Sequence, residues 1–577
     1  MKSISGKPSF GFSVFFAVLL VFTLLATTCK TDDSGENGDK TVEKIALNQK
    51  IVEAEARRQN VETSTDGTDK LSTVNWVNPA IQTALDTAIQ AAQGTLDNDN
   101  STQAKVNSAL AALNAALSNY NPQPGLLYLV TINASGYGAI APQTVIGGQT
   151  AVDPALTITK IRQVYDIIIA ANAAGQNVAT GGYNLDSAGS VSWVTEGGAP
   201  WTFTTPITGN MTITAKWTLI STGALTVADA VTNSSSSNPL VCVLGSGNSN
   251  YNVNTLNSTT NVIFTALNGA AATITSNTVG NRMFLLGGNA SVTIGKNITL
   301  TATGTKTASL IELHGDSQFT MLDGSTISNI TSDNSPEAGV VITVGNPANA
   351  NDAPEEDKPT FYMEGGLITG TDTTAAAWKR TWVSVIVITR YGKVIMSGGK
   401  ITDNWKTERI ATTAQRARGD IIPGKQVMGG DIFINAASFH ATQPRAFNSP
   451  VLEISGTAEV DYIFLAGNPV TFSPIYPTEP AGKRPHLFYI GSNWTGKIGN
   501  LIPDSANGSC MDGWKNEAII GAVEGHTLTG ADIDKIQKLM YYPAVDDNGV
   551  VQMDMQELED RRISNSGDNI GYWLERL

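Results

Sequence analysis

A short phrase that recurs in the middle of the chain constrains its fold more than any other feature of the sequence. The phrase reads FTMLDGSTISN at Phe319–Asn329, FYMEGGLITGT at Phe361–Thr371 and VIMSGGKITDN at Val394–Asn404. Two weaker copies are VTIGKNITL from Val292 and LEISGTAEV from Leu452. Units that carry the same residue types at the same positions indicate coils that stack on one another.

The phrase itself predicts a strand, a corner and a second strand. Its first and third positions are apolar in every copy, whereas the second position varies, a period of two that is typical of a strand with one buried face. Glycine can adopt the positive φ that a sharp corner needs. In the three strong copies a glycine follows the methionine by three residues, and an isoleucine then opens the next strand: Gly324, Gly366 and Gly399, followed by Ile327, Ile368 and Ile401.

A further apolar strand precedes each copy, so strand, turn, strand, corner and strand make one coil. One coil cannot bury its inner face alone, and we expect coils to stack about 4.8 Å apart as a parallel β-helix with methionines and isoleucines inside. A β-sandwich is the alternative. The spacing is 42 residues from Met321 to Met363 and 33 residues from Met363 to Met396. A compact coil needs about 20–30 residues, so the excess is expected to leave the barrel as loops.

Two of these loops carry opposite charge. Asn346–Lys358 has a local charge of −3, and Trp405–Gln426 has five basic and two acidic residues. Insertions in repeat proteins often gather on a functional face. We therefore predict a surface for an anionic glycan or a host protein. Its candidate binding residues are Trp405, Lys406, Arg409, Arg416, Arg418, Arg390 and Lys393.

The bulk composition excludes several classes of function. A chain of 577 residues has room for several domains. Its formal charge of −14 would repel a phosphate backbone, so nucleic acid is not an expected partner. The three cysteines lie far apart and the four histidines show no ligand spacing, so no metal site and no cofactor are predicted. We expect a monomer.

The N-terminus has the pattern of a secretion signal. Lys2 and Lys7 precede an apolar run from Phe10 to Ala26, and Cys29 opens a polar, acidic stretch. This arrangement resembles a bacterial lipoprotein signal of the looser spirochaete type. It implies a signal peptide over 1–28, acylation of Cys29, a flexible tether over 29–40, and attachment to a bacterial membrane, at the outer-membrane surface. Cleavage without lipidation and an uncleaved anchor are the alternatives.

The next segment changes to helical periodicity. Ala and Leu recur at i, i+3, i+4 and i+7 from Ala84 onward, with Ser101 or Thr102 as an N-cap between two helices. With an earlier helical stretch from Glu43, this predicts three helices over 41–122. The pattern, with Trp76 and Val77 before the second helix, resembles the FIVAR module of bacterial surface proteins. That resemblance implies a spacer.

Alternating strands with aromatic residues follow over 126–219. The closing stretch PWTFTTPITGNMTITAKWT resembles the internalin B-type (Listeria–Bacteroides) repeat, on Trp193, Trp201, Phe203, Thr208 to Met211, and Ala215 to Trp217. The resemblance implies a small β-grasp-like module that acts as a spacer or a protein contact. We expect its tryptophans to be core residues.

The β-helix is assigned to 223–470 and its last coils with a C-terminal cap to 471–577. Thr529 is a predicted N-cap within this end, with Asp532 as the acidic N3 residue. The whole arrangement resembles lipid-anchored β-helix proteins of spirochaete surfaces, whose right-handed coils are of the pectin-lyase-like type. The fold class is thus mainly β and multidomain, with one helical bundle.

Catalysis is an alternative function, because many β-helix proteins cleave acidic polysaccharides. Candidate groups lie at turns of the predicted coils: His314, Asp316, Asp323, Glu364, Arg390 and Lys393. Asp323 and Glu364 follow wall methionines on adjacent coils, and paired carboxylates build glycosidase and calcium sites. Turn residues on the outside of a coil are more often simply solvated. The sequence therefore favours a non-enzymatic surface lipoprotein for adhesion, with a polysaccharide lyase or hydrolase and a purely structural envelope protein as alternatives.

Lipidation is tested by metabolic labelling. Cells that produce the protein and grow with a radiolabelled fatty acid should label the wild type, and Cys29→Ala should abolish the label because the thiol is the acylated group. Label that persists in Cys29→Ala would move the modification to another residue or another mechanism.

Overall fold

The structure is a computed structural model, and its described residues form two compact units that are presented separately below. The described ranges are 38–251, 256, 258–267, 270–277, 282–332, 341–345, 358–374, 384–389, 391–407, 426–428, 431–435, 450–466, 488–504, 520–541, 556–557, 561–565 and 572–576. The first unit comprises 1–131, 141–153 and 202–212, and the second comprises 132–140, 154–201 and 213–577.

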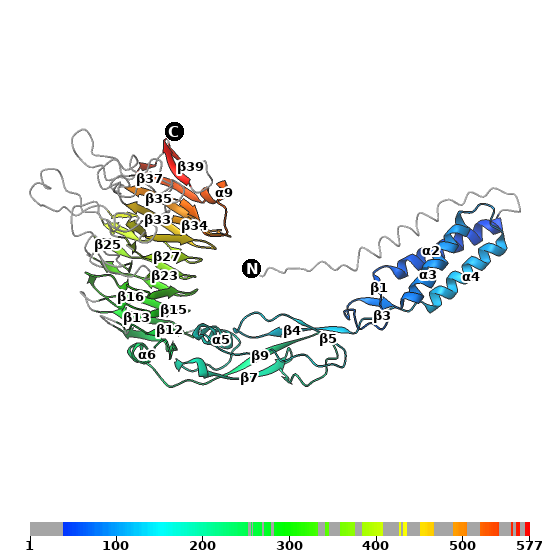
Figure 1. The fold of residues 1–577 in the computed structure, drawn as a ribbon, viewed down its shortest axis with the longest axis horizontal. Helices are drawn as coiled ribbons and strands as arrows, with labels where there is room; N and C mark the ends of the chain where they lie inside the picture. The colour runs from blue at the N-terminus through cyan, green and yellow to red at the C-terminus, as the bar shows by residue number, and fades with distance from the viewer. Residues whose placement is uncertain are drawn as a thin grey trace, which may run out of the picture. The chain divides into compact units, whose positions relative to one another are not determined.

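Three helices make up most of the first unit, namely α2 (Gly38–Arg58), α3 (Pro79–Asp97) and α4 (Gln103–Asn119) (Figure 1). They share one apolar core that includes Leu47, Leu85 and Leu113, all fully buried. The side chain of Thr102 accepts a hydrogen bond from the Lys105 backbone N–H, so the predicted N-cap of the last helix is confirmed.

Short strands border these helices. The strands β1 (Val61–Thr63), β2 (Asn75–Val77) and β3 (Gln123–Pro124) form one small sheet. After them, β4 (Leu127–Asn133) pairs antiparallel with β5 (Gln143–Ile146).

The second unit begins with strands that carry the predicted aromatic motif. In this unit β7 (Ala188–Thr195) pairs antiparallel with β8 (Pro200–Trp201) and with β9 (Met211–Leu219), after the short helix η1 (Leu185–Ser187). Trp193 and Trp217 are each 6% exposed, and the Trp217 indole donates a hydrogen bond to the Ala134 carbonyl. These two tryptophans are core residues, as predicted, whereas Trp201 is only half-buried.

The repeated phrase forms the first ladder of a parallel β-helix (Figure 1). Its neighbouring strands pair in parallel and in register, so that Phe319 lies beside Phe361 and Met321 beside Met363. The strands of this ladder, sheet one, are β10 (Leu240–Leu244), β12 (Asn261–Ala266), β15 (Ser291–Ile294), β19 (Gln318–Met321), β23 (Thr360–Met363), β27 (Lys393–Met396), β32 (Val451–Ile454), β34 (Phe488–Ile490) and β36 (Ile520–Ala522).

The strands after the glycine corners form a second parallel ladder. The strands of sheet two are β11 (Gly247–Asn250), β13 (Ala272–Ser276), β16 (Ile298–Ala302), β20 (Thr326–Ser328), β24 (Leu367–Thr369), β28 (Lys400–Ile401), β33 (Glu459–Ala466), β35 (Ile498–Asp504) and β37 (Ile536–Tyr541).

The apolar strands that precede each phrase form a third ladder, which joins sheet two at β33. Its strands, sheet three, are β14 (Phe284–Leu286), β18 (Ile311–Leu313), β22 (Ile342–Val344), β26 (Ile386–Ile388) and β31 (Ile432–Asn435). A fourth, short ladder consists of β17 (Thr305–Lys306), β21 (Thr331–Ser332), β25 (Asp372–Thr374), β29 (Trp405–Thr407) and β30 (Gln426–Met428).

The core of the β-helix is a set of apolar columns that run through successive coils. Met321, Met363 and Met396 are fully buried, as are the isoleucines that follow each corner. In a neighbouring column the rings of Phe319 and Phe361 stack with their centroids 6.0 Å apart, between Val292 and Val394. The predictions of a mainly β fold, of stacked parallel coils and of inward methionines are confirmed, and the β-sandwich is excluded by the parallel pairing.

Both ends of sheet one are closed by strands that run in the opposite direction. At the first end, β6 (Gly181–Tyr183) pairs antiparallel with β10, and α6 (Val227–Asn233) packs apolar side chains into the core. At the other end, β40 (Tyr572–Arg576) pairs antiparallel with β36 and with β39 (Arg561–Asn565). Near this end β38 (Gln556–Glu557) pairs with β37, and Thr529 and Asp532 form the predicted capping box of α9 (Gly530–Ile533).

Met363→Asp should unfold the β-helix, because an unpaired charge in an apolar interior costs at least several kcal/mol. Tyr362→Asp is the matched control, since Tyr362 is the neighbouring residue in the same strand and is half-buried on the outer face. Its effect should be within about 1 kcal/mol. Thermal melts followed by circular dichroism separate the two. Equal losses in both variants would contradict the observed inward and outward assignment.

Candidate functional site

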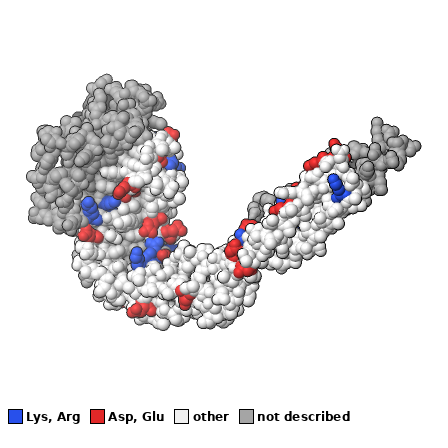
Figure 2. Space-filling model, turned by 45° about the vertical axis from the view of Figure 1, so that its right-hand side comes forward, with Lys and Arg blue, Asp and Glu red and all other residues white. Residues whose placement is uncertain are grey.

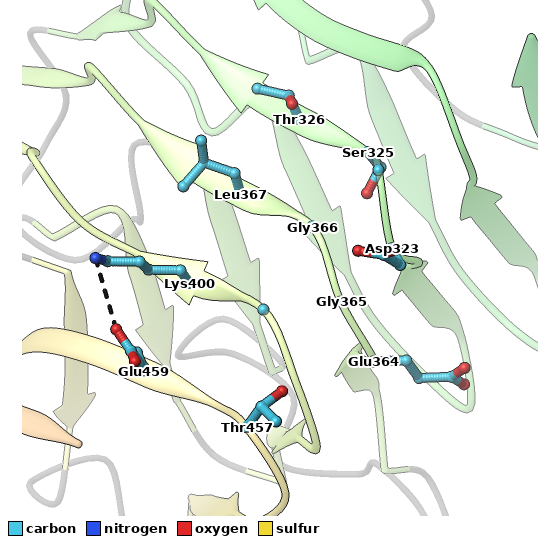
Figure 3. A pocket seen from close by; sticks show the side chains of 12 residues that line it. Asp323, Ser325, Thr326, Glu364, Gly365, Gly366, Leu367, Lys400, Thr457 and Glu459 are labelled. Carbon is cyan, nitrogen blue, oxygen red and sulfur yellow. Dashed lines mark ion pairs between the residues drawn. The ribbon is translucent and has the colours of Figure 1, made fainter. Parts of the chain in front are cut away.

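An open groove follows the glycine corners on the outside of the β-helix (Figure 3). We call it the corner groove. Its volume is about 610 Å³. It is lined by Asp323, Gly324, Ser325, Thr326, Glu364, Gly365, Gly366, Leu367, Gly399, Lys400, Thr457 and Glu459, so four successive coils contribute to it.

Backbone geometry explains why the corner carries glycine. Gly366 has a φ of +86°, a left-handed conformation in which a Cβ atom is strained. A Cβ on the preceding Gly365 would lie 2.6 Å from the Asp323 nitrogen of the adjacent coil. The coils continue to pair through the corner, since the Glu364 N–H donates to the Met321 carbonyl at 2.9 Å. Glycine thus lets the corners stack at the spacing of the strands.

The ionised groups of the groove are mostly engaged. The Lys400 ammonium lies 3.5 Å from the Glu459 carboxylate, as the dashed line in Figure 3 marks. The Glu364 carboxylate lies 3.1 Å from the guanidinium of Arg162, a residue of α5 (Ile161–Ala173). Asp323 is exposed at the groove. The groove therefore has more acidic than basic side chains, which disfavours an anionic ligand inside it.

The helix α5 fixes one flank of this region. Val164 and Ile168 of α5 pack with Val241, Ile263 and other outward side chains of the first coils. The Tyr165 hydroxyl accepts a hydrogen bond from the Lys296 backbone N–H at 3.1 Å. Because Arg162 lies on the same helix, this packing holds the guanidinium beside Glu364 and positions that carboxylate.

Two of the other sequence-predicted turn residues have protein partners away from the groove. The His314 ring nitrogen Nε2 lies 2.7 Å from Glu312, which also accepts a hydrogen bond from Arg282. Burial alone would raise the pKa of Glu312, but these hydrogen bonds outweigh it and hold the pKa below its usual value. Asp316 accepts a hydrogen bond from the Lys358 N–H. Asp323 and Glu364 are the two predicted residues that the structure brings to one groove.

The predicted basic surface is covered only in part by the described residues. The Lys393 ammonium lies 2.7 Å from the Glu453 carboxylate of the next coil. Trp405 and Lys406 belong to β29, which pairs antiparallel with β30. Cys29, Arg390, Arg409, Arg416 and Arg418 lie outside the described residues. The binding role of this surface stays a prediction.

Metal and membrane sites can be assessed only within the described ranges. In those ranges no three His, Cys, Asp or Glu side chains are grouped as metal ligands would be. None of the helices in the same ranges has both the length and the apolar character needed to cross a bilayer.

The surface view shows how sparse charge is. On the face drawn in Figure 2, acidic and basic side chains gather in a few small groups, with large areas between them that carry no charged group. The corner groove is thus one of the places where charged residues from several coils meet.

A buried polar chain that sequence reasoning missed crosses the coils near the groove. The Asn404 side chain accepts hydrogen bonds from the N–H and hydroxyl of Thr371 and donates to Asp431 at 2.8 Å. The second carboxylate oxygen of Asp431 accepts from the Tyr462 N–H at 2.9 Å. Burial, with Asp461 nearby, raises the pKa of Asp431 to about 8, although these hydrogen bonds lower it. In sequence, Asp431 follows two glycines and resembles an exposed turn residue.

Comparison of the chain with protein-family models, with curated proteins and with solved structures finds no match. The resemblances described above therefore rest on the quoted motifs alone.

Asp431 predicts a specific pH dependence of stability. The pKa of Asp431 is about 8 in the folded protein and near 3.9 in the unfolded chain. The protonated carboxyl therefore contributes fully to the free energy of unfolding below about pH 4, and this contribution is lost as the pH rises through about 8. Urea unfolding at pH 5 and pH 9 should show that the wild type loses several kcal/mol more than Asp431→Asn, which cannot ionise. Parallel losses in the two proteins would rule out the buried carboxyl as the cause.

Proposed function

We propose that this chain is a non-enzymatic, lipid-anchored protein of the bacterial cell envelope whose β-helix serves in adhesion to a glycan or a host protein. In this proposal Cys29 carries the lipid at the outer-membrane surface. The helical module of the FIVAR type and the internalin B-type module act as spacers. The right-handed, pectin-lyase-like β-helix is the part that presents a binding surface.

The observation that carries the proposal is the form of the corner groove. It is open to solvent and is assembled from equivalent positions of four coils. Such a groove suits an extended ligand that lies across the coils, because four successive coils each contribute residues of the same corner to its lining. An extended glycan or a peptide segment has this shape.

A polysaccharide lyase or hydrolase is the second candidate, and the groove supports it less well. General acid–base catalysis needs a carboxylate or a basic side chain that is free to exchange a proton with the substrate. In the groove Glu364 is paired with Arg162 and Glu459 with Lys400. Asp323 is exposed, but it has no second unpaired carboxylate beside it in the lining of the groove. The third candidate, a purely structural envelope protein, would leave the groove without a ligand.

Two surfaces are candidates for the binding site. The basic segment between β29 and β30 carries the predicted residues Arg409, Arg416 and Arg418 and suits an anionic glycan or an acidic protein. The corner groove, with more acidic side chains, suits a neutral or amine-bearing ligand. Binding to sulfated glycans tests the basic segment, and binding to neutral or amine-bearing glycans tests the corner groove.

The test replaces 408–425, which connects the paired strands β29 and β30, with a Gly-Ser linker of turn length. Adhesion to immobilised sulfated glycans should be lost, whereas the melting temperature should change little because loop length costs little stability. Adhesion by the wild type should also weaken with added salt, because exposed charges are screened.

A groove variant is the matched comparison. Thr457→Trp places a large side chain into the corner groove from an exposed position. If Thr457→Trp alone abolishes adhesion, the ligand binds in the groove rather than at the basic segment. Release of reducing or unsaturated sugars from a glycan panel would favour the enzyme, and no adhesion by any form would favour the structural protein.

A further inference from the structure

Sheet two carries a regular array of hydroxyl side chains on its outer surface. Two columns run through the successive strands β13, β16 and β20. We call this array the hydroxyl face. It consists of Thr273, Thr299 and Thr326 in one column and Thr275, Thr301 and Ser328 in the other.

The pairing of the strands places these residues in register. Thr273 pairs with Thr299, and Thr299 pairs with Thr326. In the second column Thr275 pairs with Thr301, and Thr301 and Ser328 each follow a residue of the Leu300–Ile327 pair. Parallel strands lie about 4.7–4.9 Å apart, and residues i and i+2 of one strand are about 6.5 Å apart. The face is therefore a two-dimensional lattice with fixed repeats.

The residues between the two columns show which way the hydroxyls point. Ile274, Leu300 and Ile327 alternate with the threonines and are fully buried in the core. The flanking threonines must point outward because side chains alternate across a strand. Thr275 is only 8% exposed, whereas Thr273, Thr299, Thr301 and Thr326 are half-buried. Among the described residues, the hydroxyls of these four half-buried threonines have no hydrogen-bond partner.

The face carries no charge. The columns continue to Asn248 and Asn250 of β11 on one side and to Leu367 and Thr369 of β24 on the other, all uncharged. The first ionised residue of the column is Lys400. Neither an ionic polymer nor a metal ion would find a partner on such a face.

The side chains present also argue against a soluble sugar as the ligand. Sites for small organic ligands are concave and rich in aromatic residues, whereas these columns hold only Thr, Ser, Asn and Leu. Exposed hydroxyls contribute little binding free energy when a flexible ligand merely replaces the water bound to them. Favourable binding needs many matched contacts made at once with a rigid, repeating surface.

We propose that the hydroxyl face binds ice. The faces of hexagonal ice are rigid and uncharged, and their oxygen atoms repeat at a spacing close to that of β-strands. Threonine offers a hydroxyl for this lattice and a methyl group that fits between the oxygens. On an anchored envelope protein the face would attach the cell to ice. The inference goes beyond the adhesion proposed above. Thr326 and Leu367 also line the corner groove, so the test below alters Thr299 and Thr301, which do not line it.

The test is ice-affinity purification with the full chain. A dilute solution is frozen slowly onto a cooled probe, and the protein concentration in the ice is compared with that in the liquid, with serum albumin as the non-binding reference. The wild type should enter the ice several-fold more than albumin. Thr299→Tyr, which puts a ring across the middle of the lattice, should reduce entry to the albumin level.

Matched variants keep this result interpretable. Thr144→Tyr makes the same change at an exposed strand residue of β5 and should behave as the wild type. If the Thr299→Tyr variant melts at a lower temperature than the wild type, the Thr301→Tyr variant, altered in the second column, is used in its place. Wild-type entry into ice at the albumin level, or equal entry by the folded tyrosine variants, would overturn the proposal. Adsorption of the wild type to crystalline cellulose or chitin with no entry into ice would also overturn it and assign the face to an insoluble glycan.

Discussion

In-register stacking of apolar side chains is the constraint on which the β-helix depends. Each coil buries its inner side chains only against the coil before and the coil after it, so every strand must present the same inward positions at the same height. Met321, Met363 and Met396 occupy one such column, and Phe319 and Phe361 occupy another. The glycine corners, the groove beside them and the outward columns all take their spacing from these contacts.

The same constraint decides how much of the structure could be predicted from sequence. The alternation around each methionine and the glycine three residues later were sufficient to predict the strands, the corners and the parallel stacking, because core positions repeat when coils stack. The helix α5 was not predicted, since Arg162 and Tyr165 meet Glu364 and Lys296 only through contacts between distant parts of the chain. Asp431 was missed for a similar reason, because turn-like surroundings in sequence conceal complete burial.

The candidate surfaces illustrate a second limit of sequence reasoning. Lys393 is a predicted binding residue, yet the register of the strands places it beside Glu453, 60 residues later in the chain. Conversely, threonines that looked like ordinary strand residues form continuous columns once the strands are aligned. In a repeat protein each outer surface is made of side chains from several coils. Similar residues in coils with insertions of different length are hard to recognise in the sequence, and they form one surface only when the strands are in register.

The reversed strands at the two ends of sheet one bear on how the molecule could evolve. A parallel ladder with an open edge can accept a strand from another copy and grow into a fibre. Here β6, with only Gly181–Tyr183, and β40 reverse the strand direction where that growth would begin. Loss of β6 would expose the edge of β10 to a strand from another copy, whereas duplication of an internal coil would lengthen the ladder and leave the antiparallel strands at both ends in place. Changes in the number of coils are therefore an easier evolutionary path than changes at the ends.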